Sequence, residues 1–520
     1  MKHALALLFV ISPAMCKAVE VKSRFDVTYA TYGDRKVRLD LFSPEGIQGA
    51  RPAVVVVHGG GWLKGDKSKM RPIALELAKR GYVTAAIEYR LAGEAKFPAA
   101  VNDCMAAVRW LRANHKSLHI DPRKIVAVGG SAGGHLVGLM ATASHVAKLQ
   151  GKGGNADQSS AIQSAVVMAG PMILDRGPVA QRSRKQPTRS NANKWFGKSV
   201  DEAPQLYKLA SPQSHISSQS PPVLFQVGEL DAPNRNQSMR TKLRKLKIAT
   251  GLRVYKSGKH GCWNSKQYRA LFVDDMDAFF RDTLRFDSVA HQQKKTAWGH
   301  IEFFRDRAVL ALDRPANRGT IHLPRLNNRT KKVYPEGKPR QKLALRPGTK
   351  SWALRLPDSL NQSGTRIVVE TIGQPVIGRS AMVATPLANG TIQLAAHQAT
   401  VTGKKLRYEP QPHKNTVGYW TDPKDTCHWH FFVDKPGKYD VVVFQGCGKG
   451  HGGSTVAVLI GKRKLKFTVE DTGHFQNFKD RKIGTVTFEK SATVKLTLKP
   501  IKKARVAIMD VRRIRLIPAK

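Results

Sequence analysis

The feature that most constrains this chain is a regular alternation, between Val27 and Arg285, of short apolar runs and amphipathic stretches. Segments with apolar residues at spacings of three and four predict helices, as at 71–81, 98–114 and 269–284. Because alternating strands and helices form βαβ units, this half is predicted to be α/β, with a parallel sheet covered by helices on both faces. The runs that predict its strands are 53–58, 83–89, 124–130, 165–170, 222–228 and 252–258.

Two departures from this rhythm divide the chain further. Residues 173–214 are polar and basic, and they predict an insertion over one end of the sheet. After Arg285 the chain contains short apolar runs separated by Gly, Pro, Asn and Lys turns, with almost no helical period. We therefore predict an α/β domain at 19–285 and two all-β sandwich modules at 290–378 and 380–520, divided where the strand rhythm weakens.

The charge of the chain is strongly positive. Lys and Arg total 87 against 38 Asp and Glu, a net charge of +49 that both halves share about equally. No helix-turn-helix, zinc-finger or RNA-recognition signature surrounds the basic runs, so nucleic acid is not a predicted partner. A charge spread over the whole surface leaves anionic polymers as candidate partners.

The first eighteen residues predict a secretory signal peptide. They combine a basic start, an apolar run too short to cross a bilayer, and small residues near Cys16 and Ala18. A buried N-terminal helix is the alternative, which Pro13 disfavours. No later segment has about 18 uninterrupted apolar residues, so no transmembrane segment is predicted and a secreted or periplasmic location is expected.

Four further cysteines, Cys104, Cys262, Cys427 and Cys447, form no C-x-x-C pair. A zinc site is therefore not predicted, and no metal or other cofactor is expected. In an oxidising compartment Cys427 and Cys447 could bridge neighbouring strands, and two buried thiols are the equal alternative.

The candidate nucleophile lies in Gly129–Gly133, which has the form strand, G-x-S-x-G, helix. A serine on so sharp a turn is exposed at the helix N-terminus, but its hydroxyl needs an adjacent base that a carboxylate holds in place. Asp231 and His260 each follow a predicted strand, in the chain order Ser, Asp, His expected of an α/β-hydrolase. We predict Ser131 as nucleophile, His260 as base and Asp231 as acid, with Glu229 as a rival acid.

A run of three glycines, Gly59–Gly61, directly follows the first strand of this pattern. Acyl transfer places negative charge on a carbonyl oxygen, which backbone N–H groups can stabilise where no side chain blocks their approach. The N–H groups of Gly60, Gly61 and Ala132 are therefore the predicted oxyanion hole. His58 is expected to brace this loop by hydrogen bonding.

Four stretches carry a family resemblance: HGGGW at 58–62, EYRLAGE at 88–94, FPAAVND at 97–103 and GGSAG at 129–133. Together they resemble the hormone-sensitive-lipase-like esterases, and within that group the bacterial feruloyl and acetyl xylan esterases, over about residues 25–285. The resemblance implies ester hydrolysis through an acyl-enzyme. The chain departs from the family pattern at Gly93, where relatives usually have proline, and at Gly130, where they usually have aspartate before the serine.

The β half carries weaker resemblances. Residues 290–375 are similar to the β-sandwich that follows the catalytic barrel in α-L-fucosidases, although this chain has no such barrel. Residues 385–518 resemble a galactose-binding-like jelly roll, in which nothing fixes calcium ligands.

Four tryptophans are candidate substrate-binding residues. Trp420 and Trp429, in the last β module, could stack on sugar rings, whose C–H faces suit aromatic surfaces. Trp62 and Trp263 could line an acyl pocket. Ordinary core packing is the alternative reading for all four, because alternate residues of a sandwich strand face its core.

The leading prediction is thus a secreted or periplasmic serine esterase, acetyl xylan esterase-like, that removes acetyl or feruloyl groups from polysaccharides or oligosaccharides such as xylan. A peptidase with the same three residues, a general lipase or carboxylesterase, and a non-catalytic carbohydrate-binding protein are the alternatives.

Overall fold

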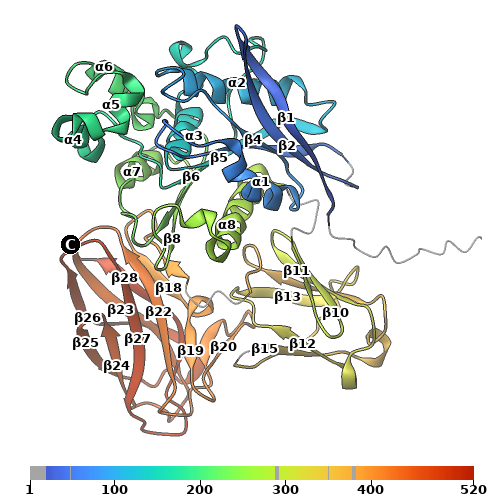
Figure 1. The fold of residues 1–520 in the computed structure, drawn as a ribbon. Coiled ribbons are helices and arrows are strands. Elements are labelled where there is room, and N and C mark those ends of the chain that lie inside the picture. The colour runs from blue at the N-terminus through green and yellow to red at the C-terminus, as the bar shows by residue number, and fades with distance from the viewer. Residues whose placement is uncertain (1–18, 47–48, 287–291, 350, 378–381, 520) are drawn as a thin grey trace, which may run out of the picture.

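The computed structural model of the chain describes residues 19–46, 49–286, 292–349, 351–377 and 382–519. Its strands fall into three groups along the chain, with the N-terminal group above the two others in Figure 1. The predicted signal peptide at 1–18 lies outside the described residues. Among the residues that are described, no helix combines the length and apolar character needed to cross a membrane.

The N-terminal half is built on one eight-stranded sheet in the order β1-β2-β4-β3-β5-β6-β7-β8. The six strands β3 to β8 are mutually parallel, which confirms the predicted α/β class. The antiparallel hairpin β1-β2 at one edge was not predicted. The strands are β1 (Val21–Tyr32), β2 (Arg35–Pro44), β3 (Arg51–Val57), β4 (Val83–Ile87), β5 (Ile120–Gly130), β6 (Ala165–Met168), β7 (Val223–Gly228) and β8 (Thr250–Tyr255).

Helices flank this sheet, with α1 packed on α8 and α2 packed on α3. The predicted insertion supplies three short helices that gather at one end of the domain in Figure 1, α4 (Gly177–Lys185), α5 (Asn191–Phe196) and α6 (Pro204–Leu209). The remaining helices are α1 (Arg71–Ala78), α2 (Ala99–Ala113), α3 (Ala132–Thr142), α7 (Gln237–Lys245) and α8 (Lys266–Leu284).

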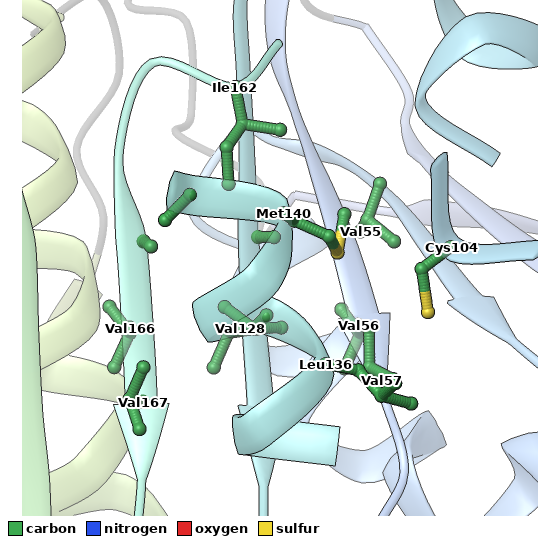
Figure 2. Close-up of a cluster of buried hydrophobic side chains, with 14 of the residues drawn as sticks. Val55, Val56, Val57, Cys104, Val128, Leu136, Met140, Ile162, Val166 and Val167 are labelled. Carbon is green, nitrogen blue, oxygen red and sulfur yellow. The ribbon is translucent and has the colours of Figure 1, made fainter. Parts of the chain in front are cut away.

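The centre of this domain is an apolar layer between β3, β5, β6 and the helices α2 and α3 (Figure 2). All seven residues of β3 are buried, because a parallel strand is covered on both faces. Leu136 and Met140 on α3 and Cys104 on α2 pack toward the valines of β3 and β5, and all three are fully buried. This packing holds rigidly the strand ends from which the site residues project.

The chain after α8 is all β within the described residues, apart from single 3₁₀ turns. The middle part contains a five-stranded sheet, β13-β16-β11-β10-β9, and a three-stranded sheet, β12-β15-β14. Its strands are β9 (Gln292–Lys295), β10 (Gly299–Phe303), β11 (Arg307–Leu312), β12 (Thr320–Pro324), β13 (Thr330–Pro335), β14 (Leu345–Pro347), β15 (Ser351–Arg355) and β16 (Arg366–Thr371).

The C-terminal part contains two six-stranded sheets. One includes β17-β22-β27-β24-β25 with β19, and the other includes β20-β21-β28-β23-β26 with β18. Its strands are β17 (Val383–Ala384), β18 (Ile392–Ala395), β19 (Thr400–Thr402), β20 (Arg407–Glu409), β21 (Thr416–Gly418), β22 (Thr426–Val433), β23 (Gly437–Cys447), β24 (Thr455–Ile460), β25 (Arg463–Thr468), β26 (His474–Phe488), β27 (Ala492–Lys502) and β28 (Asp510–Pro518).

The four cysteines within the described residues are free thiols. Cys427 lies on β22 of one sheet and Cys447 on β23 of the other, and both are buried and free. Cys104 and Cys262 are also free. Of the two alternatives that the sequence left open for Cys427 and Cys447, the structure therefore has the buried thiols.

The C-terminal part packs directly against the α/β domain, beside α7 and β8 (Figure 1). Phe432 on β22 belongs to the same buried apolar cluster as the α/β core. Arg240 on α7 is 1% exposed, and its Nη2 donates to both carboxylate oxygens of Asp434 at 3.0 Å. The Nε and Nη1 atoms of Arg240 are buried with no hydrogen-bond partner, so its charge depends on Asp434.

Replacing Asp434 with alanine is therefore expected to destabilise the contact between the two parts. Breaking a buried ion pair leaves an uncompensated charge, which costs about 3 kcal/mol. Thermal and urea unfolding of the full chain would show a lower midpoint. The control is Asp440→Ala, whose ion pair with Lys482 is exposed and should matter little. Equal midpoints for the two variants would contradict this prediction.

Candidate active site

Ser131 occupies the sharp turn between β5 and α3. Its φ of 56° and ψ of −119° are unfavourable for a residue with a side chain, so the backbone there is strained. The turn is held by Ser131 N–H, which donates to Met168 O at 2.8 Å. A Cβ on Gly133 would overlap the carbonyl oxygens of Val57 and His58, which explains why helix and strand can approach so closely here. Ser131 is thereby raised at the carboxyl edge of the sheet.

The structure brings the three predicted catalytic residues together. Ser131 Oγ lies 3.0 Å from His260 Nε2, and His260 Nδ1 lies 2.7 Å from Asp231 Oδ2. Asp231 is 8% exposed, whereas the side chain of His260 is half exposed. A buried carboxylate on Nδ1 and a hydroxyl on Nε2 is the geometry in which an imidazole can take the hydroxyl proton.

The rival acid, Glu229, points elsewhere. Its Oε2 accepts a hydrogen bond from the backbone N–H of Ser257 at 2.7 Å, so Glu229 ties the loop after β7 to the loop after β8. Asp231, two residues later, is the carboxylate in contact with the imidazole. The geometry therefore favours Asp231 over Glu229 as the acid.

The glycine loop after β3 faces the nucleophile with free donors. Gly61 has a φ of 64°, and a Cβ there would also overlap Asn191 Nδ2 on the insertion. Across the described part of the chain, no protein acceptor pairs with the backbone N–H groups of Gly60, Gly61 or Ala132. Gly61 and Ala132 line the same cavity as Ser131. Such unpaired N–H groups beside a nucleophile suit an oxyanion.

His58 braces this loop, as expected. It is buried, its ring stacks on Tyr89 at 4.3 Å, and its Nδ1 lies 2.7 Å from Gly59 O. The Tyr89 hydroxyl donates to His58 O at 3.1 Å. Burial lowers the pKa of His58, which favours the neutral ring in this structural position.

A cavity of about 280 Å³ opens at Ser131, just below the usual range of volumes for ligand pockets. Helices α4 and α5 of the insertion form one wall, so the predicted insertion covers this end of the sheet. The apolar lining comes from Trp62, Ala169, Pro171, Pro178, Val179 and Ala192, and the polar lining from Ser131, Arg182, Ser190, Asn191 and Arg235.

Trp62 lines this cavity, and its ring is held in position by Trp195 and His135. Its ring stacks on Trp195 of α5 at 4.8 Å, and its Nε1 donates to His135 Nδ1 at 3.3 Å. His135 Nε2 lies 2.7 Å from Ala210 O, so Nε2 carries the proton and donates to that carbonyl. Burial lowers the pKa of His135 to about 4, which keeps this neutral form.

Trp263, by contrast, does not line the cavity, and its core-packing alternative is correct. It is 3% exposed and packs edge-on against His260 at 5.4 Å. A Cβ on Gly130 would lie 2.7 Å from the Trp263 ring. The ring thus fills the space that the usual aspartate of the resembled family would need, which gives a physical reason for glycine before the nucleophile.

The structure contradicts the prediction that Trp420 and Trp429 stack on sugars. Each is 1% exposed, and each indole N–H is satisfied internally: Trp420 donates to Asp425 O at 3.1 Å and Trp429 to Ala395 O at 2.8 Å. Both rings belong to the buried core between the two C-terminal sheets. A ring in a sandwich core has no face left for a ligand. Their neighbour Tyr419 is the exposed aromatic.

The sequence analysis missed Arg235. Its Nη2 donates to Asp231 Oδ1 at 2.5 Å, and its Nη1 donates to Ala169 O at 2.7 Å. The carboxylate is therefore held on one oxygen by Arg235 and on the other by His260. The spacing of four residues from Asp231 was the available signal, because such pairs meet where the chain turns helically.

Changing Arg235 to methionine is expected to lower kcat on a neutral ester by roughly tenfold, because one charge-assisted hydrogen bond no longer holds Asp231. KM should change less than kcat, since the altered contact positions the acid. Arg235→Lys should recover part of kcat. Steady-state kinetics on p-nitrophenyl acetate measures both, with exposed Arg253→Met as control. A pure KM effect would show that Arg235 does not position Asp231.

In the described ranges, no three His, Cys, Asp or Glu side chains come together as a group that could hold an ion.

Comparison with known proteins adds two family matches. Residues 39–243 match the family model described as BD-FAE, and residues 401–518 match the domain of unknown function DUF5077. The first covers most of the sheet and the nucleophile, and the second covers most of the C-terminal β part.

Curated relatives of the N-terminal half include esterases of Mycobacterium tuberculosis. The chain is 30% identical over 223 residues to the probable carboxylic ester hydrolase LipM, which covers 40% of this chain and 48% of LipM. It is 29% identical over 209 residues to the esterase LipQ, again 40% of this chain and 48% of the relative. The match to the carboxylesterase NlhH is 34% over 130 residues, 25% of this chain and 40% of NlhH. The chain thus spans less than half the length of these relatives.

Solved structures with similarity include a truncated carbohydrate esterase from gut microbiota, with a TM-score of 0.46, 23% identity, and coverage of 52% of this chain and 98% of that one. A thermophilic esterase of Thermogutta terrifontis, Est2, has a TM-score of 0.43, 26% identity, and coverage of 51% and 94%. On the strength of the BD-FAE match, the curated relatives and the sheet topology, the N-terminal half of this chain is an α/β-hydrolase fold similar to carboxylic ester hydrolases.

Proposed function

We propose that this protein is a serine carboxylic ester hydrolase. The observation that carries the proposal is the hydrogen-bonded chain Ser131, His260 and Asp231, with unpaired N–H groups of Gly61 and Ala132 beside it in one cavity. A nucleophile, a base, an acid and an oxyanion site converge within hydrogen-bond reach, as acyl transfer requires.

Each residue has a definite step in this mechanism. Ser131 Oγ attacks the ester carbonyl carbon while its proton passes to His260 Nε2. The carbonyl oxygen becomes negative and accepts hydrogen bonds from Gly60, Gly61 and Ala132. His260 then gives its proton to the leaving alcohol oxygen, which leaves the acyl group on Ser131. A water molecule then attacks the carbonyl carbon of the acyl-enzyme while its proton passes to His260 Nε2. The bond to Ser131 Oγ breaks, His260 returns the proton to Oγ, and the carboxylic acid is released.

We further propose that the substrate is a polysaccharide or oligosaccharide, such as xylan, that carries acetyl or feruloyl ester groups. Two features support this. The side chain of His260 is half exposed, so the site can accept part of a large alcohol. The cavity of about 280 Å³ suits a small acyl group better than a long lipid chain. The basic start and short apolar run at 1–18 support export to the periplasm or the medium.

Hydrolysis of model esters tests the chemistry. We expect p-nitrophenyl acetate, methyl ferulate and acetylated xylan to be hydrolysed, and p-nitroacetanilide to be hydrolysed much more slowly. A fluorophosphonate should label Ser131 alone, as peptide mass spectrometry can show, because it reacts with activated serines. Faster cleavage of the anilide would favour a peptidase. No labelling and no turnover would favour a non-catalytic binding protein.

A further inference from the structure

The charged side chains that line the active-site cavity are all positive. Its lining includes two guanidinium groups, Arg182 and Arg235, and no Asp or Glu. The nucleophile Ser131 lies in the same lining. A ligand in this cavity therefore meets positive charge close to the reacting bond.

The two arginines are not equivalent. Arg235 already donates to the Asp231 carboxylate at 2.5 Å and to Ala169 O at 2.7 Å. Arg182, on α4, makes no side-chain hydrogen bond or ion pair with any described residue. Its charge is therefore the uncompensated one in this lining.

Two other arginines close to Arg182 in the chain are paired with acids. Arg184, two residues along the same helix, donates from Nε to Asp201 Oδ1 at 2.9 Å. Arg176, just before the helix, donates to Asp175 at 2.9 Å. By contrast Arg182, the arginine of this helix that lines the cavity, has no acidic partner among the described residues.

From these observations we infer that the preferred ester carries an anionic group, a carboxylate or sulfate, close to its scissile bond, and that Arg182 binds that group. The inference deepens the proposed esterase function and rests on it. A guanidinium is planar and offers parallel N–H donors that match carboxylate and sulfate oxygens. The substrate class is thus an acylated acidic sugar, such as a uronate or a sulfated sugar, or an ester whose acyl group is acidic.

The net positive charge of the whole chain also favours anionic substrates. A net charge of +49 attracts anions over the entire surface and speeds their encounter with it. That attraction is screened beyond about 10 Å in 0.1 M salt. Arg182 is exposed at the lining of the cavity, but a hydrogen-bonded contact with it acts at a distance well inside that screening length. Salt and single substitutions can therefore separate the general effect from the specific one.

The test compares matched anionic and neutral esters on the full chain. On the acyl side, p-nitrophenyl hemisuccinate is paired with p-nitrophenyl levulinate, which has the same size and no charge. On the alcohol side, acetate release from an O-acetylated methyl glucuronoside is paired with release from the O-acetylated methyl glucoside. The measured quantity is the anionic-to-neutral ratio of kcat/KM, in 0.02 M and 0.5 M salt.

The wild type should prefer the anionic member of at least one pair, and that pair identifies which side of the ester is acidic. Arg182→Gln should lower the ratio by roughly tenfold at both salt concentrations, because a charge-assisted contact is lost. Arg182→Lys should retain part of it. Arg184→Gln removes the same charge from the same helix and should leave the ratio nearly unchanged at 0.5 M salt.

Three results would overturn the inference. Equal falls with Arg182→Gln and Arg184→Gln would mean that net charge alone attracts anions. Turnover of both members of each pair without preference would refute the anionic substrate and leave the esterase function standing. No turnover of any ester would overturn the proposed function and this inference together.

Discussion

Replacing Ser131 with alanine is expected to lower kcat on p-nitrophenyl acetate by about 10⁶-fold, the loss found when the nucleophile of a serine hydrolase is removed. Without Oγ no acyl-enzyme can form, and His260 has no hydroxyl to deprotonate. Alanine fits the turn sterically and removes one atom, so the fold should persist. Steady-state assays and fluorophosphonate labelling should both report the loss.

The matched control is Ser218→Ala, an exposed serine in the loop before β7. Its turnover and labelling should equal those of the wild type. If Ser131→Ala kept even a hundredth of the wild-type kcat, another nucleophile would be responsible. Trypsin-digest mass spectrometry of the labelled protein would then locate it.

The second large effect is expected from Asp231→Asn, a loss of about 10⁴-fold in kcat. Asp231 Oδ2 accepts a hydrogen bond from His260 Nδ1 at 2.7 Å, and Asp231 Oδ1 accepts one from Arg235 Nη2. An amide carries no charge to stabilise the imidazolium that forms during attack. It can also present N–H to Nδ1, which stabilises the tautomer with its proton on Nε2 and blocks transfer from Ser131.

Glu229→Gln is the matched comparison, two residues away and with the same change from acid to amide. Its oxygen accepts from Ser257 N–H in a loop contact, and an amide oxygen can still accept that bond. Little loss of kcat is expected. A larger loss with Glu229→Gln than with Asp231→Asn would show that the geometric assignment of the acid is wrong.

Much of the α/β half could be predicted because its signals are local. The helices predicted at 71–81, 98–114 and 269–284 correspond to α1, α2 and α8, with ends within a few residues. The spacing of apolar residues along a helix or strand indicates which of its faces is buried, because each element must bury its own apolar face. The β1-β2 hairpin was not predicted. Strand β1 is largely exposed and carries little apolar pattern, whereas β2 buries Val37, Leu39, Leu41 and Phe42 and could have been recognised.

The cluster of Ser131, His260 and Asp231 was also predictable, for a topological reason. In a parallel sheet the carboxyl ends of the strands meet at one edge, so residues that follow β5, β7 and β8 must lie near one another. The motif around Ser131 and the chain order then suffice to choose candidates. The sequence favoured Asp231 but kept Glu229 as a rival, because both follow β7, and the contacts of the tertiary structure favour Asp231.

The sequence by itself thus determined the α/β class, the position of the sheet edge and the residues that gather there, because short-range patterns encode them. The tertiary structure alone decided which aromatic rings are buried, as for Trp420 and Trp429, and which arginine holds Asp231 or remains unpaired in the cavity. Burial and pairing depend on what other segments place beside a side chain, and residues distant in sequence supply those neighbours.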